Sequence, residues 1–230
     1  MSRAREQARG LLRTARRSPL LDRVVLRVRW GSLRRLQPED KWGYERGLPV
    51  DRWYIERFLH EHRALIVGHV LEVKEDLYAS RFGAERVDIL DIDPTNSRAT
   101  LVGDLCNAST LPAEAFQAAV ITQTLQFIPD PVQALRHLMQ SLRSGGHLLL
   151  TVPAVSRTGS DDDMWRWTAA GLRRTLTDAG AADAEVVAHG NALSCRSFLA
   201  GLGAGDLAES VLRQDDRSYP LLVTAVVRRA

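Results

Sequence analysis

The chain of 230 residues contains only two lysines and two cysteines. Cys106 and Cys195 lie far apart and form no CxxC pair, so we expect neither a disulfide framework nor a metal site. The longest apolar runs, such as HLLLTV and LLVTAVV, have the length of strands, which excludes a transmembrane helix. The first residues lack the continuous apolar stretch and the cleavage site of a secretory signal. These shortages favour a protein of the reducing cytoplasm that has no membrane partner.

Glycine is missing where a nucleotide-binding sheet would need it. The stretch VLEVKEDLYASRFG, residues 70 to 83, reads as a first strand that runs into a ligand loop. A dinucleotide site has GxGxxG there, because glycine lets backbone amides approach a pyrophosphate. Here Lys74, Glu75 and Asp76 occupy the turn, and the next glycine is Gly83. A nicotinamide-dependent reductase or epimerase would also need a Tyr-x-x-x-Lys pair, which Lys41 and Lys74 do not form, so we expect no dinucleotide.

Positive charge is concentrated at the start of the chain. Residues 1 to 36 contain eleven arginines and two acids, whereas the whole chain has a net charge of +3. We expect a basic N-terminal arm over 1–40, with a helical part, followed by one domain over 41–230. Such an arm suits nucleic acid, an anionic membrane or an acidic partner, but a solvated arm needs no ligand. Because the arm lacks regularly spaced aromatic residues, we expect no nucleic acid partner.

Strands and helices alternate through the remaining sequence. A helix with Asp51 as its N-cap is expected first, and its apolar face repeats in Ile55, Phe58, Leu59, His62 and Ile66. Strands follow in HVLEV, VDILDID, ATLV, AAVIT and HLLLTV. Asp130 and Pro131 begin a helix that runs to Leu142 and is stopped by Ser144-Gly145-Gly146. EVVAHG, a helix around Ser197 to Leu212, and YPLLVTAVVRR complete an α/β fold, in which a parallel sheet has helices on both faces.

Polar residues follow the expected strands in order. They are Glu72 in the first strand, Asp91 and Asp93 after the second, Asp104 after the third, and Gln123 and Thr124 after the fourth. Ligands in such sheets collect at the carboxyl ends of the strands. Asp93 follows Glu72 at about the 20-residue spacing of an acid that binds ribose, and Asp104 is placed to accept the exocyclic amine of an adenine. Each acid alone is more typical of a cap or turn than of a ligand site, but together, in this order, they favour an adenosine without a pyrophosphate.

Several segments resemble the class I S-adenosylmethionine-dependent methyltransferases over about residues 42 to 230. They are VLEV, DILDIDP, VGDLCNASTLP, the stretch from Ala118 to Pro153, and WRWT. The resemblance implies a Rossmann-like sheet of seven mostly parallel strands, with the seventh antiparallel between the fifth and sixth, and S-adenosyl-L-methionine as cofactor. RGLPVDRWYIERFL and YASRFG are similar to a bacterial small-molecule subgroup of methyltransferase type 11, some of whose members belong to secondary metabolism and antibiotic biosynthesis.

The resemblance also implies roles for individual residues of the cofactor site. Glu72 and the loop from Lys74 to Tyr78 would lie along the methionine part of the cofactor, Asp93 at the ribose, and Asp104 with Leu105 at the adenine. Gln123 completes this set of cofactor contacts. Lys74 departs from the usual glycine: either it pairs with the cofactor carboxylate, or it fills the space that the cofactor needs. The second case would leave a non-catalytic scaffold that binds a partner.

The acceptor of the methyl group is a small polar molecule, expected to contain a sugar, with a hydroxyl favoured over an amine. A hydroxyl needs a positioned base, for which His189 is the main candidate and the acids Asp161 to Asp163 are a weaker one. The loop from Pro153 to Asp163 is expected to act as a lid. Candidate contacts to the acceptor are Tyr44, Arg46, Tyr54, Trp165 and Arg166. A structural role is more typical of a lone histidine at a strand end, and helix packing is the favoured alternative for Tyr54. Whether the chain forms a homo-oligomer stays open.

Overall fold

The computed structural model describes residues 42–230, and the expected N-terminal arm lies outside these residues. The strands are β1 (Gly68–Val73), β2 (Ala84–Asp91), β3 (Leu101–Val102), β4 (Phe116–Thr122), β5 (Leu142–Pro153), β6 (Glu185–His189) and β7 (Leu222–Arg228). The α-helices are α3 (Val50–Glu61), α4 (Ala79–Phe82), α5 (Pro131–Ser141), α6 (Ala169–Asp178), α7 (Ala192–Leu199) and α8 (Glu209–Leu212). Short 3₁₀ turns are η1 (Tyr44–Arg46), η2 (Arg63–Leu65), η3 (Leu125–Phe127) and η4 (Ala204–Asp206).

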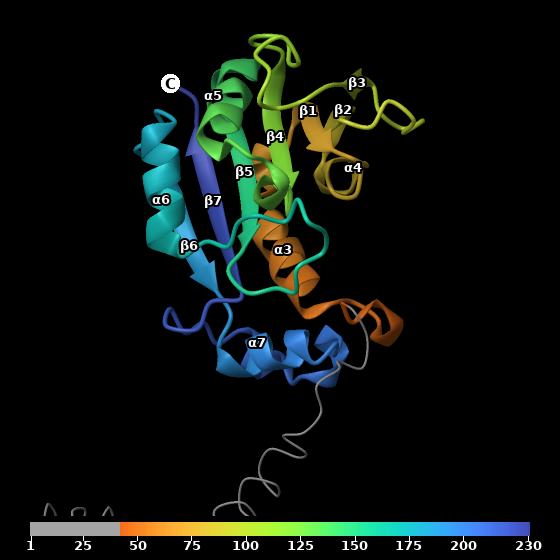
Figure 1. Cartoon of the computed structure of the whole chain (residues 1–230), viewed down its shortest axis with the longest axis vertical. Coiled ribbons are helices and arrows are strands. Elements are labelled where there is room, and N and C mark those ends of the chain that lie inside the picture. The colour runs from red at the N-terminus through yellow and green to blue at the C-terminus, as the bar shows by residue number, and fades with distance from the viewer. Residues whose placement is uncertain (1–41) are drawn as a thin grey trace, which may run out of the picture. The chain divides into compact units, whose positions relative to one another are not determined.

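One seven-stranded sheet has the order β3-β2-β1-β4-β5-β7-β6. β7 runs antiparallel to both of its neighbours, and the pairings among β1 to β5 are parallel. The expected fold class, including the position of the seventh strand, is confirmed. Because the other strands run in one direction, their carboxyl ends lie along one edge of the sheet, which is its lower edge in Figure 1, above α7. Ligands of open α/β sheets bind at this edge.

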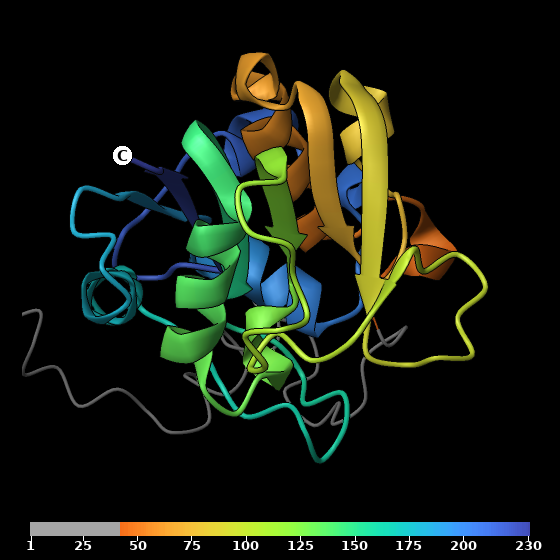
Figure 2. The same cartoon turned by 90° about the horizontal axis from the view of Figure 1, so that it is seen from above.

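Helices cover both faces of the sheet, as Figures 1 and 2 show. α5 and α6 pack on one face through side chains such as Leu135 and Leu172, in a cluster with Leu148 and Leu150 of β5. α3, α4 and α7 cover the other face, where Ile55 and Phe198 pack in a second cluster with Val120 and Leu149. Successive residues of β5 thus contribute to opposite cores, as the two-residue period of a strand requires. The middle strands are buried on both faces and hold the carboxyl edge rigidly.

The best-defined expectation, α5, is confirmed with its cap. The Asp130 carboxylate accepts a hydrogen bond from the backbone N–H of Gln133 at 3.0 Å, and Pro131 occupies the first turn. The helix ends at Ser141 and β5 begins at Leu142, so the strand starts earlier than the expected HLLLTV. Gly145 has φ 77°, a left-handed value that glycine adopts readily. The glycines therefore lie within the irregular start of the strand.

Two helices differ from expectation. Pro49 is the N-cap of α3, and Asp51 lies within its first turn, where its Oδ1 accepts a bond from the backbone N–H of Arg52 at 2.8 Å. The prediction that Asp51 is the N-cap was wrong, because Pro49 already brings the chain to the helix start. The helix expected around Ser197 to Leu212 is divided into α7 and α8, since Gly201 adopts φ 76° after α7 and ends it.

The residues before α3 are joined to the segment after α7. Arg46 forms an ion pair with Asp206, with Nη2 to Oδ1 at 2.6 Å, and Ala204 donates its backbone N–H to the Leu48 carbonyl at 2.7 Å. Pro49 and Gly203 form an isolated β-bridge. A Cβ atom at Gly203 would lie 2.5 Å from the Arg46 carbonyl oxygen, so only glycine permits this approach. The contacts fix the start of α3 in place.

In the part of the chain from Trp42 onward, we find no helix with the length and apolar character needed to span a bilayer.

Candidate active site

A cavity of about 710 Å³ opens at the carboxyl edge, beside the ends of β1, β2 and β4. We call it the larger cavity. Its lining includes Arg52 of α3, Val73 to Glu75 and Leu77 after β1, Leu90 to Ile92 at β2, Gly103 to Leu105, Thr122 to Thr124, Phe127 to Pro129, and Ser160 and Asp162 of the loop before α6. The chain segments that the sequence predicted at the strand ends therefore do meet in one hollow.

Lys74 lies in the wall of the larger cavity and leaves it open. Its backbone is left-handed, with φ 73°, where glycine is favoured. Two hydrogen bonds hold this conformation: the Lys74 N–H donates to the Leu90 carbonyl at 2.8 Å, and the Asn96 side chain donates to the Lys74 carbonyl at 2.8 Å. The Lys74 side chain is exposed. The loop thus has the backbone conformation that glycine favours, at a position that holds lysine.

Glu72 of β1 holds the loop that follows this strand. Its carboxylate is 2% exposed and accepts hydrogen bonds from the backbone N–H groups of Leu77, Tyr78 and Ala79, the last at 2.8 Å. Burial raises the pKa of this carboxyl to about 7, although the backbone donors oppose the change. Glu72 does not line the larger cavity, and Tyr78 is buried in the core beneath α3. We expected Glu72 and Tyr78 to contact the cofactor directly. The structure instead places both behind the loop, where they support it.

The acid that faces the larger cavity after β2 is Asp91, whereas Asp93 lies outside the lining. Asp93 instead accepts bonds from the backbone N–H and hydroxyl of Thr95, which lower the pKa of its carboxyl. Asp91 is positioned by the Asn96 amide, which donates to Oδ2 at 2.7 Å. Asp91, and not the predicted Asp93, is therefore the acid at the wall of the larger cavity. The two acids lie almost equally close to the expected spacing from Glu72, so spacing could not separate them.

Asp104, Leu105 and Gln123 line the larger cavity as expected. The Asp104 Oδ1 accepts the Cys106 N–H at 2.8 Å, which turns the chain at this point. Leu105 and Ile128 are buried and give this end an apolar wall. An apolar wall beside a carboxylate suits a flat base that carries an exocyclic amine.

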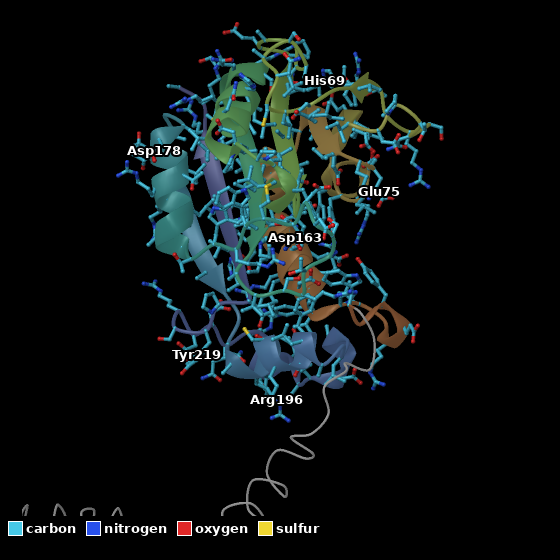
Figure 3. All side chains as sticks on the ribbon, viewed as in Figure 1. His69, Glu75, Asp163, Asp178, Arg196 and Tyr219 are labelled. Atoms are coloured by element: carbon cyan, nitrogen blue, oxygen red, sulfur yellow. The ribbon has the colours of Figure 1, made fainter. Side chains whose placement is uncertain are left out.

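A second cavity of about 240 Å³, the smaller cavity, adjoins the larger one. The two share Arg52, Gln123 and Phe127. The rest of the smaller lining is Trp42, Tyr44, Asp51, Gln126, Pro153, Ser156, Gly159, Asp163 and Arg166. Figure 3 labels one lining residue of each, Glu75 for the larger and Asp163 for the smaller. Adjoining cavities allow two ligands to meet.

The loop between β5 and α6 contributes to both cavities. Asp163 joins two parts of this loop. Its Oδ2 accepts hydrogen bonds from Arg166 Nη2 at 2.8 Å and from the Gly159 N–H at 2.9 Å. The bond from Arg166 lowers the pKa of the Asp163 carboxyl. The Met164 N–H donates to the Gln126 carbonyl at 2.9 Å and ties the loop to η3. Among the three acids Asp161 to Asp163, Asp162 lines the larger cavity and Asp163 lines the smaller one. The Asp163 carboxylate is already paired with Arg166.

Among the expected acceptor contacts, Tyr44 and Arg166 line the smaller cavity. Arg46 lies outside both cavities and pairs with Asp206. Tyr54 is 1% exposed and packs in the core of α3. Trp165 also lies outside the linings, and its indole N–H donates to the Ile128 carbonyl at 2.9 Å. The expected contacts of Arg46, Tyr54 and Trp165 with the acceptor are therefore corrected. Tyr54 packs in the core, and Arg46 and Trp165 bind other segments of the chain.

His189, the expected base, lies away from both cavities at the end of β6. It is 6% exposed and shares a hydrogen bond of 2.9 Å between Nε2 and the Thr224 hydroxyl. Its Nδ1 lies 3.6 Å from the Asp215 carboxylate. Burial would raise the pKa of Asp215, but His189 and the Gly190 N–H outweigh it and lower that pKa. His189 is therefore a buried structural residue, because α7 and the segment before β7 cover this end of the sheet.

Sequence reasoning missed Asp51 and Arg52 of α3, which line the smaller cavity. Burial raises the pKa of the Asp51 carboxyl, although Arg52 opposes the change. The segment RGLPVDRWYIERFL contains both residues, but nothing in it indicates that the first turn of a helix reaches a strand edge. In the described region 42–230, no group of His, Cys, Asp and Glu could hold a metal ion.

Comparisons with known proteins agree with this geometry. Residues 73–150 match the family model of the methyltransferase domain. An S-adenosylmethionine-dependent methyltransferase from Thermotoga maritima, described as a possible histamine N-methyltransferase, is 17% identical with a TM-score of 0.57, covering 81% of this chain and 95% of its own. A second from Mesorhizobium loti is 16% identical with a TM-score of 0.50, over 78% and 98%.

A structure named as the [4+2]-cyclase SpnF has 18% identity and a TM-score of 0.51, covering 91% of this chain and 92% of its own. No curated protein sequence matches the chain. At these identities the structures establish the fold alone. Residues 73–150 match the methyltransferase domain, and the described chain has the fold of structures described as S-adenosylmethionine-dependent methyltransferases.

Proposed function

We propose that the chain binds S-adenosyl-L-methionine in the larger cavity and transfers its methyl group to a small polar acceptor in the smaller cavity. The observation that supports this most directly is that the two cavities adjoin at Arg52, Gln123 and Phe127. Direct transfer requires the acceptor atom, the methyl carbon and the sulfur to lie in line. The shared wall is the place where this alignment is available.

The residues of the larger cavity suit the cofactor. Each oxygen of the Asp91 carboxylate already accepts one hydrogen bond, from the Asp93 N–H and from the Asn96 amide, and has a second lone pair for a ribose hydroxyl. Asp104 with Leu105 suits the adenine. Lys74 and Gln123 lie at the end nearer β1 and β4, beside the methionine part. The sulfonium of the cofactor supplies the activated methyl group when it is bound. The chain supplies orientation and excludes water, which is the main demand of such a transfer.

Asp51 is the proposed base, in place of His189. It lines the smaller cavity, and its raised pKa makes it a better proton acceptor than an ordinary carboxylate. With a hydroxyl acceptor, the bound cofactor would supply the methyl group, and Asp51 would take the proton that the acceptor oxygen loses. An amine acceptor that arrives unprotonated would need this base less. Tyr44 and Arg166 are proposed to contact the acceptor, whose sugar content rests on the sequence resemblance.

Calorimetric titration with S-adenosylmethionine tests the cofactor assignment. We expect micromolar binding, whereas no binding up to millimolar concentration would favour the scaffold alternative. A mass-spectrometric screen of polar hydroxyl and amine compounds, read for products heavier by one methylene, then identifies the acceptor. With that acceptor, Asp51→Asn should lower turnover about a hundredfold or more if the atom is oxygen. Full turnover in this variant would remove Asp51 from the mechanism.

A further inference from the structure

Arg52 is the cation that both cavities share. Its Nε donates to the Tyr44 hydroxyl at 3.2 Å, which fixes the guanidinium beside the shared wall. Nη1 is buried and has no hydrogen-bond partner among the described residues. The nearest carboxylate oxygen, Oδ2 of Asp51, lies 3.7 Å from Nη1, which is beyond hydrogen-bond distance. One donor of a fixed guanidinium is therefore unsatisfied.

An unsatisfied buried donor on a cation is costly, because the lost hydration is not replaced. Arg52 nevertheless stays charged: burial alone would lower its pKa, but Asp51 and the hydroxyl of Tyr44 raise it. A guanidinium with a free donor at the wall of a ligand cavity suits an anionic group of the ligand. Charge-assisted hydrogen bonds to carboxylates are among the strongest hydrogen bonds in proteins. Arginine favours this partner, because its planar fork matches a carboxylate.

The loop after β1 has few backbone donors left for such a group. The N–H groups of Leu77, Tyr78 and Ala79 all bind Glu72. The N–H of Lys74 binds the Leu90 carbonyl. Of this loop, only the N–H groups of Glu75 and Asp76 bind no group of the described structure, so a side chain from outside the loop is well placed to supply most of the contact to an anion. Arg52 comes from α3, before β1.

We propose that Arg52 binds the carboxylate of the methionine portion of S-adenosylmethionine. The inference rests on the proposed function, which places the sulfonium at the shared wall. The amino-acid chain and the methyl group both leave the same sulfur, so the carboxylate cannot lie far from that wall. Lys74 is less suited to this task because its side chain is exposed to solvent and no part of the described structure pairs with or orients its ammonium group.

Two adenosine probes test the assignment by binding alone. S-adenosylhomocysteine carries the carboxylate, and 5′-methylthioadenosine shares the nucleoside and the sulfur but lacks the amino-acid chain. Arg52→Gln should weaken S-adenosylhomocysteine about tenfold to a hundredfold, because a charge-assisted bond is lost. Its affinity for methylthioadenosine should not change, which also shows that the variant is folded. Calorimetry measures both constants.

The matched control is Arg57→Gln, on the same helix and outside both cavities, where Arg57 pairs with Glu61 at 3.1 Å. It should leave both probes unaffected. Lys74→Gln should weaken S-adenosylhomocysteine less than Arg52→Gln does.

If Arg52→Gln weakens both probes equally, or neither, the assignment to the carboxylate is overturned. A larger loss in Lys74→Gln than in Arg52→Gln would transfer the role to the lysine. If the unaltered chain binds neither probe, the proposed function itself is overturned and this inference with it.

Discussion

Polar residues at the strand ends are open to a cavity in one half of the sheet edge and buried in the other half. At the ends of β1, β2 and β4, Asp91, Asp104 and Gln123 line an open cavity. At the end of β6, His189 is equally well placed along its strand but is buried against Thr224 and Asp215. The two halves differ because α7 and the segment before β7 pack over the end of β6, whereas the ends of β1, β2 and β4 open into the larger cavity. A strand end indicates a ligand site only where no later segment packs over it.

The largest expected effect concerns two carboxyls, the buried Glu72 and the more exposed Asp215, whose pKa values shift in opposite directions. Glu72 has a pKa raised from 4.5 to about 7 by burial. Its contribution to stability is therefore complete below pH 4.5 and is lost as the pH rises through 7, by about 3 kcal/mol. Urea titrations between pH 4 and pH 8 should show this loss, and Glu72→Gln should remove it.

Asp215 gives the opposite sign as a control. Its pKa is lowered in the folded chain, so its contribution is present above the ordinary value and is lost as the pH falls through the lowered one. Asp215→Asn should flatten only the acid side of the curve. A loss of stability above pH 5 that persists in Glu72→Gln would contradict the assignment.

The next effect separates the two acids after β2. Asp91→Ala should weaken S-adenosylhomocysteine by roughly 2 kcal/mol, because a carboxylate that accepts from ribose hydroxyls is lost. Asp93→Ala should leave the affinity unchanged, since its carboxylate binds Thr95 outside the cavity. Calorimetry of both variants decides the matter, and the reverse ranking would restore Asp93 as the ribose acid.

A smaller effect tests the closed half. His189→Ala should reduce the free energy of unfolding by roughly 1 to 2 kcal/mol, because the buried Thr224 hydroxyl loses its partner. Cofactor affinity should be unchanged, since His189 lies outside both cavities. Denaturation and calorimetry on the same preparation measure both quantities. Normal stability combined with lost methyl transfer would return His189 to the active site.

The smallest effect concerns the left-handed residue of the loop. Lys74→Gly should stabilise the fold by about 1 kcal/mol or less, because relief of the positive φ is offset by the greater freedom of glycine when unfolded. Lys74→Ala keeps the Cβ atom and should give no such gain. Equal thermal midpoints for the two variants would show that the loop carries no strain.

The sheet and its helices were predictable because their signals are local. Alternating apolar segments, the Asp130 cap and the glycines after α5 each act over a few residues. Four residues predicted for the cofactor site, Lys74, Asp104, Leu105 and Gln123, do line the larger cavity, since parallel strands bring their ends to one edge. Spacing from Glu72 could not separate Asp91 from Asp93, because both lie close to the expected value. Arg52 and Asp51 depend on how α3 crosses the sheet, which no local pattern encodes.

The bridge between Pro49 and Gly203 has a consequence for anyone who alters the chain. It connects the start of the helix that carries Arg52 to the turn after α7, about 150 residues further along the sequence. Shortening or lengthening that turn would displace the guanidinium before it disturbed any strand. A change in the turn after α7 is therefore also a change in the wall of the larger cavity.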